Sequence, residues 1–223
     1  MSDISNEVRV GRVLRASTRG FVVGCEVMQP DIPAFGSLVR VENRTTSVDP
    51  LEADVADRSG RFVRDSALYG LIYDVSVEDD LFVRHFIGAD TPEEVILGMR
   101  ENRQVPIEVS VLAVGTGRGL TGDRGAIRQC LPAQPPVTLD WLYQCGDAEV
   151  RAFTARFDYF RLVLEAREVP ADELLAANLR IAAAARQDRE RETFMVGAGR
   201  ELARLLAGDP VRLEGLLRRM RIA

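Results

Sequence analysis

The sequence predicts an α+β protein in which a small antiparallel β-barrel precedes a bundle of about four helices. Two observations predict this fold class. Up to the prolines near position 133, short runs rich in Val, Ile, Leu and Phe alternate with turn residues, as strands do. Beyond these prolines, apolar residues recur at spacings of three and four, the helical period. We therefore expect two domains, residues 1–133 and residues 134–223.

Six strand-like runs make up the predicted barrel. Turn residues separate them, as at Arg19-Gly20 and at the acidic Glu78-Asp79-Asp80. The alternation of apolar and polar positions is imperfect in the first run, so its register stays open. Many short strands with such breaks are typical of a closed or nearly closed barrel. The predicted strands are residues 8–17, 20–28, 36–43, 68–77, 81–88 and 105–114.

Two segments interrupt this strand pattern. Residues 44–67 are polar with few large apolar side chains, and we expect a long, disordered loop there. Residues 90–104 carry helix signals, because Pro92 fits a first helical position and Glu93 and Glu94 suit the positive end of the helix dipole. We expect a short helix inserted between two strands.

Four amphipathic segments make up the predicted helical domain. The first, residues 147–166, carries one apolar stripe formed by Val150, three phenylalanines and Leu164. Such an aromatic stripe can line a ligand pocket, but core packing is the preferred interpretation. The other segments are residues 171–186, a helix from about Arg189 that ends at Gly208, and a last helix that begins after Asp209-Pro210.

The composition excludes several chemistries. All 29 basic residues are arginine, whereas a Walker-type phosphate loop, a pyridoxal-phosphate Schiff base and a lysine general base each need a lysine amine. The only histidine, His85, lies in a strand-like run, and the spacing of the cysteines fits no zinc site. The three cysteines are Cys25, Cys130 and Cys145. We predict no catalytic residue, no metal ligand and no cofactor.

Charge and hydropathy bear on partners and location. The net charge of −5 argues against strong binding to a phosphate backbone, which depends on concentrated positive charge. No apolar stretch approaches the roughly 18 residues that span a bilayer, and the start, MSDISNEVRV, lacks a secretory pattern. We expect a cytoplasmic protein with no membrane contact.

A glycine-rich stretch, GTGRGLTGDRG at residues 115–125, imitates two phosphate-binding loops. Residues 117–122 fit GxGxxG, but the chain that follows, with Pro132 close behind, leaves no room for the helix whose N-terminus would hold a pyrophosphate. As a GxxxxG loop, the stretch has Asp123 where a lysine must reach the phosphates. We therefore expect no nucleotide and interpret the stretch as a hairpin connection between residues 105–114 and the run AIRQCL.

The predicted barrel resembles the HAS barrel, the N-terminal barrel shared by HerA-type DNA translocases and ATP synthase ring subunits. The shared features are pattern-level: glycines that open or precede strands, a strand that ends in Val-Glu, and an exit through two prolines. They are Gly11, Gly36, Gly70, Val41-Glu42 and Pro135-Pro136. In those families the proline exit leads into a motor domain with a phosphate loop, whereas here a helical segment takes its place. The resemblance therefore implies the barrel without the ATPase domain.

This resemblance implies a role in protein–protein contacts rather than in catalysis. HAS barrels form a crown on a ring, and in the translocases they help to dock a nuclease. We therefore expect a non-enzymatic interaction or assembly module, an adaptor for a separately encoded DNA-processing motor or nuclease, with a protein partner or further copies of itself. Candidate surfaces are the 44–67 loop and exposed sheet edges that accept an extra strand.

Two alternatives stay open. Small barrels often hold single-stranded nucleic acid with arginines and aromatic side chains, and four arginines near the first hairpin are the candidates: Arg9, Arg12, Arg15 and Arg19. Binding that weakens steeply with salt would favour this reading over the adaptor. The second alternative is an enzyme with an unrecognised site, for which only the acidic run 78–80 offers ligands for a divalent ion.

Overall fold

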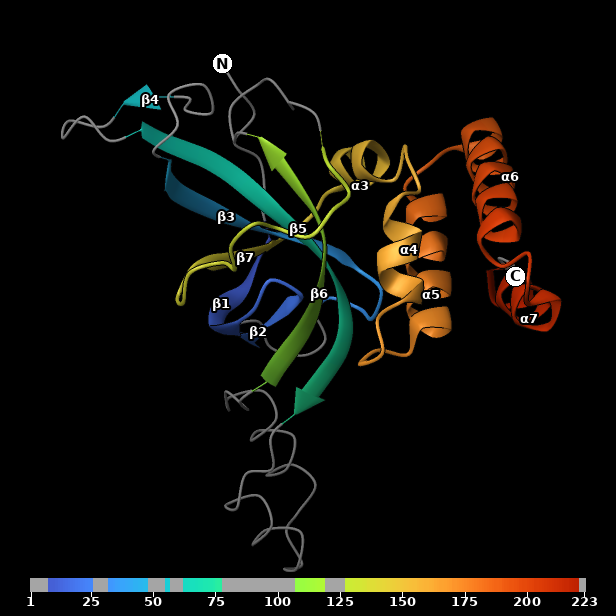
Figure 1. Cartoon of the computed structure of the whole chain (residues 1–223), viewed down its shortest axis with the longest axis horizontal. Coiled ribbons are helices and arrows are strands. Elements are labelled where there is room, and N and C mark those ends of the chain that lie inside the picture. Colours follow the sequence, from blue (N-terminus) through green and yellow to red (C-terminus); the bar gives the residue numbers. More distant parts are fainter. Residues whose placement is uncertain are drawn as a thin grey trace, which may run out of the picture.

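The computed structural model describes residues 8–25, 32–47, 55–56, 62–77, 107–118 and 127–220. Seven strands precede five helices, which confirms the predicted α+β class (Figure 1). The strands are β1 (Arg9–Ala16), β2 (Gly20–Cys25), β3 (Leu38–Ser47), β4 (Val55–Ala56), β5 (Phe62–Val77), β6 (Ile107–Arg118) and β7 (Trp141–Gln144). The helices are α3 (Asp147–Phe153), α4 (Tyr159–Leu164), α5 (Ala171–Ala184), α6 (Asp188–Leu205) and α7 (Pro210–Met220). Among these, no helix has the length and apolar composition that a membrane crossing requires.

Six of the strands close into an antiparallel barrel. The strand order is β3-β7-β1-β2-β6-β5, and pairing of β3 with β5 completes the ring, while β4 pairs only with β5. Closure gives each of these six strands a partner on both sides over part of its length, which leaves little open edge for another strand. Beyond Val41, the described pairings join β3 only to β5, so the expectation that an exposed sheet edge serves as a docking site stays a prediction for this end of β3.

The interior of the barrel is filled by its own side chains. Val, Ile and Leu residues from β1, β2, β3, β5, β6 and β7 form one buried cluster, which includes Val10, Val23, Val41, Ile72 and Val109 at 0% exposure. Inward positions alternate with outward ones along each strand, as in other small barrels. The lumen is therefore a packed core, and function must be sought on the outside of the barrel.

The strand β7 was not predicted, and it moves the predicted domain boundary. Its four residues lie between β3 and β1, with Val39 opposite Gln144 and Arg12 opposite Trp141. The barrel therefore extends to Gln144 instead of ending at residue 133. A run of only four residues carries no periodicity, and β7 is a strand because both neighbours offer it backbone partners.

Half of the residues in the predicted loop 44–67 lie in strands. The β3–β5 ladder runs without interruption from Leu38 opposite Leu71 to Ser47 opposite Phe62. Residues 44–47 and 62–67 are thus paired, and residues 55–56 form β4. The prediction of a structureless segment was wrong for these described residues because backbone pairing holds them, which their weak hydrophobicity did not reveal, while residues 48–54 and 57–61 lie outside the described part of the chain. The predicted strand 81–88 and the predicted helix 90–104 lie outside the described residues.

The glycine-rich stretch begins as strand. β6 continues through Arg118, four residues beyond the predicted end, and Thr116 forms an antiparallel bridge with Arg128. Mutual backbone hydrogen bonds of 2.8 Å join Thr116 and Arg128. This bridge agrees with a hairpin connection between the two predicted runs, while residues 119–126 lie outside the described part of the chain.

The predicted helix 147–166 is broken into α3 and α4. Gln129, in the connection between β6 and β7, bonds the backbone at this break: its Nε2 donates to the carbonyl oxygens of Phe153 (2.6 Å) and Arg156 (3.0 Å). Its Oε1 accepts from the backbone N–H of Tyr159 at 3.1 Å. One amide side chain therefore satisfies the end of α3 and the start of α4, which the apolar stripe alone does not reveal.

The helices pack on the barrel rather than standing apart. Leu38, Tyr69 and Leu71 of the barrel share one buried cluster with residues of all five helices, and Figure 1 shows α4 to α7 gathered on one side of the sheet. Buried polar contacts cross the same boundary. Asn178 of α5 donates to the carbonyl oxygen of Gly36 (3.0 Å) and accepts from the Tyr159 hydroxyl (2.7 Å). Barrel and helices therefore form one structural unit.

Candidate interaction surface

A tryptophan between two arginines marks the outer face of β1 and β7. The register places Arg12 directly opposite Trp141, and the Arg12 guanidinium carbon lies 3.7 Å from the centroid of the indole ring. The guanidinium carbon of Arg9 lies 5.1 Å from the same ring. Each such contact at an exposed site is worth about 0.5–1 kcal/mol. The two arginines and the ring therefore favour one another's observed positions by a modest amount.

Leu139 lies beside this group in a strained conformation. It is the one non-glycine residue in the described ranges with positive φ, 72°, and its side chain is 60% exposed. Its backbone is held from both directions: its N–H donates to the carbonyl oxygen of Val13 (2.8 Å), and its own carbonyl oxygen accepts from Arg12 Nη1 (3.0 Å). Positive φ costs a residue with a Cβ roughly 1–2 kcal/mol. The hydrogen bonds to β1 offset this cost.

The turn that carries Leu139 is closed by Asp140. The Asp140 carboxylate accepts from the backbone N–H of Val137 at 3.1 Å, and the Asp140 N–H donates to the carbonyl oxygen of Val137 at 3.2 Å. Val13 also donates its N–H to the Asp140 carbonyl oxygen at 3.0 Å. Partial burial raises the pKa of the Asp140 carboxyl, while the hydrogen bond from Val137 lowers it. The turn is thus fixed to the barrel at several points.

We call Arg9, Arg12, Leu139 and Trp141 the tryptophan face. Val137, 57% exposed, lies at its margin in the same turn. Figure 1 shows β1 and β7 on the side of the barrel away from α6 and α7. The face therefore combines exposed apolar surface, an aromatic ring and positive charge on a part of the barrel that those two helices do not cover.

The four arginines predicted to bind nucleic acid divide into two pairs. Arg9 and Arg12 meet at Trp141, whereas Arg15 lies 3.5 Å from a carboxylate oxygen of Glu108. Arg19, in the turn between β1 and β2, reaches Glu168 in the α4–α5 connection at 3.1 Å. Two of the four are thus engaged by carboxylates within the chain, and the structure does not bring all four together as one track of positive charge.

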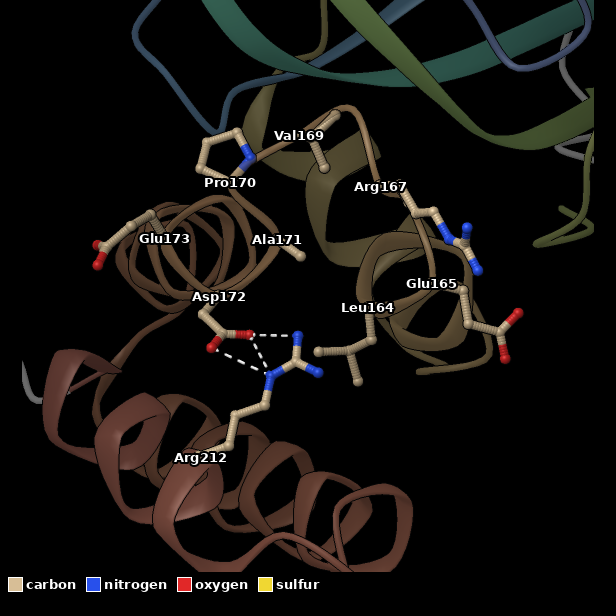
Figure 2. Close-up of a pocket in the computed structure, with 10 residues that line it drawn as sticks. Leu164, Glu165, Arg167, Val169, Pro170, Ala171, Asp172, Glu173 and Arg212 are labelled. Carbon is tan, nitrogen blue, oxygen red and sulfur yellow. Dashed lines mark hydrogen bonds and ion pairs between the residues drawn. The ribbon is translucent and has the colours of Figure 1, made fainter.

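A second candidate, a shallow hollow of about 460 Å³, lies between the α4–α5 connection and α7 (Figure 2). Its main polar groups already pair with each other: Arg212 Nη2 lies 2.7 Å from Asp172 Oδ1, and Arg212 Nε bonds both carboxylate oxygens. This hydrogen bonding raises the pKa of Arg212. The pair joins α5 to α7, and we assign it a structural role.

Reactive groups in the described ranges are buried or isolated. Burial raises the pKa of the Cys145 thiol, and burial likewise raises the pKa of the Tyr159 hydroxyl, which donates to Asn178. Within those ranges, no group of three His, Cys, Asp or Glu side chains is placed to hold a metal ion. The acidic run 78–80 and His85 lie outside the described residues.

Two members of the tryptophan face were missed from the sequence. Trp141 belongs to β7, whose four residues carry no periodic signal, and Leu139 stands out only by its backbone angle. The single tryptophan in a chain of 223 residues, close behind two prolines, was the available signal. Comparison with protein-family models and with curated proteins finds no match. The resemblance to the HAS barrel therefore stays a prediction beside an observed small antiparallel barrel.

Proposed function

We propose that this protein is a non-enzymatic interaction module that docks a protein partner through the tryptophan face. The proposal is carried by the conformation of Leu139, whose apolar side chain is exposed to solvent and whose backbone has positive φ. Both features cost stability, and Asn or Gly would tolerate the same backbone angle more easily. Strain of this kind concentrates at functional positions.

The residue types on the face support the same proposal. Tryptophan and arginine are enriched among the residues that carry most of the energy of protein interfaces. Here the Trp141 ring is already oriented by Arg12 and Arg9, so little side-chain freedom is lost when a partner covers it. A closed barrel with a filled interior supplies a rigid support for such a surface.

The partner class rests on the resemblance alone. If the barrel is of the HAS type, the chain is an adaptor or assembly subunit for a separately encoded DNA-processing motor or nuclease. The helical layer occupies one side of the barrel and leaves the tryptophan face on another, which suits a subunit that is attached through its barrel (Figure 1).

Single-stranded nucleic acid is the alternative ligand for this face. Its bases would stack on an aromatic ring, and its phosphates would need several arginines. Arg12 already covers the Trp141 ring at 3.7 Å, and Arg15 and Arg19 already face carboxylates. These contacts favour a protein partner over nucleic acid.

Affinity isolation from the organism's own cells tests the proposal. The full chain, Trp141→Ala and the control Val196→Ser are compared, since Val196 is an exposed apolar residue (47%) on α6, outside the face. We expect a reproducible companion protein with the wild type and the control, but not with Trp141→Ala, and we expect it to survive nuclease treatment. Equal recovery with Trp141→Ala, or recovery of nucleic acid alone, would contradict the proposal.

A further inference from the structure

We infer that the tryptophan face recognises an acidic segment of its partner, with Arg9 as the carboxylate anchor and Leu139 as the apolar contact beside it. The inference rests on the proposed function and adds the chemistry of the partner. A segment in which Asp or Glu side chains alternate with large apolar residues has the complementary properties.

Arg9 is the exposed cation of the tryptophan face. Its side chain is exposed, and within the described part of the chain its guanidinium contacts the Trp141 ring without facing a carboxylate. Arg15 on the same strand, by contrast, lies 3.5 Å from a carboxylate oxygen of Glu108. A cation that contacts a ring and has no carboxylate partner among the described residues can bind a carboxylate through its N–H donors.

Arg12 sets the geometry of the site. Its Nη1 donates to the carbonyl oxygen of Leu139, and its guanidinium stacks on the Trp141 ring at 3.7 Å. These two contacts bring the exposed Leu139 side chain and the ring to the same place. The ligand that fits them must therefore offer negative charge and apolar surface at neighbouring positions.

The charge of the protein also bears on the chemistry of its partner. The chain as a whole carries a net charge of −5, so its overall charge does not attract an acidic partner, and attraction must come from a local group of basic side chains. Arg9 and Arg12 bring two positive charges to the tryptophan face, and the Asp140 carboxylate lies in the adjoining turn. An acidic segment gains attraction from these arginines, which is how charge complementarity selects a partner and an orientation.

The test uses the full chain and the fluorescence of its single tryptophan. Short synthetic peptides free of tryptophan, either acidic and leucine-rich or basic and leucine-rich, are titrated separately, and a thymidine oligonucleotide is titrated in parallel. We expect the acidic peptides to change the Trp141 emission at concentrations at least about tenfold lower than the basic peptides. Arg9→Glu should weaken the acidic peptides about fivefold or more, since a pairing charge becomes a repelling one.

Arg200→Glu is the matched control. Arg200 is exposed on α6, and its reversal changes the net charge equally, but we expect less than about a twofold effect at physiological salt because screening limits its reach. Equal responses to acidic and basic peptides, or a response to the oligonucleotide alone, would overturn the inference. So would an Arg9→Glu chain that binds acidic peptides like the wild type. If the native companion protein still depends on Trp141 in that case, the proposed function stands and only the acidic chemistry fails.

Discussion

A methyl group added at Gly36 probes the joint between barrel and helices. Gly36 has φ of 86°, and a Cβ there would lie 2.7 Å from the Cβ of Ala177 and 2.8 Å from the backbone nitrogen of Asn178. Positive φ costs a residue with a Cβ about 1–2 kcal/mol, and overpacking a core costs about 1–3 kcal/mol. We expect Gly36→Ala to lower the free energy of unfolding by about 2–5 kcal/mol.

Two probes follow the unfolding of this variant. Trp141 fluorescence reports on the barrel, and far-ultraviolet circular dichroism reports on the helices. Because both parts share one buried cluster, the two signals should change together, with a midpoint about 4–20 °C below that of the wild type.

Gly208→Ala is the control, because nothing lies within 4 Å of the added Cβ, and its midpoint should change little. A lower helical midpoint for Gly36→Ala with an unchanged Trp141 midpoint would contradict cooperative unfolding of barrel and helices. In that case the barrel would fold without its helices.

Three further substitutions test the account by urea unfolding. Tyr159→Phe leaves the buried Asn178 Oδ1 without its donor and should cost about 1–3 kcal/mol; no loss would mean that this buried bond is unimportant. Leu139→Asn should raise the unfolding free energy by up to about 1 kcal/mol through relief of strain, and a loss of stability would argue against strain. Burial raises the pKa of Asp140 above 3.8, so the folded state binds this proton more tightly and loses stability as pH rises. Asp140→Asn should therefore gain on the wild type as the pH rises from below 3.8 through the raised pKa of the folded state, and a constant difference would contradict this sign.

The fold class was predictable because it depends on periodicity. Apolar runs broken by turn residues indicated the barrel, and a 3.6-residue stripe indicated the helices. Features that depend on distant partners were not predictable. β7 is a strand because β1 and β3 pair with it, and the helix predicted at 147–166 breaks where Gln129 bonds its backbone.

The candidate site was predictable only in part, for the same reason. Arg9 and Arg12 stood out as a cluster of charge on one strand, and Arg15 and Arg19 were grouped with them by sequence proximity. Their partners come from far along the chain: Trp141 for the first two, Glu108 and Glu168 for the others. Sequence spacing within β1 cannot reveal which arginines are neutralised.

Photo-crosslinking from position 139 tests whether the tryptophan face docks a protein partner. A photo-reactive p-benzoylphenylalanine replaces Leu139 in the full chain, in the organism's own cells, and a parallel chain carries it in place of Val196 on α6. Both positions are exposed and apolar. We predict a discrete adduct with another protein from position 139 that is absent from position 196. Irradiation that yields no adduct at position 139, or the same adducts at both positions, would contradict a docking role for this face of the barrel.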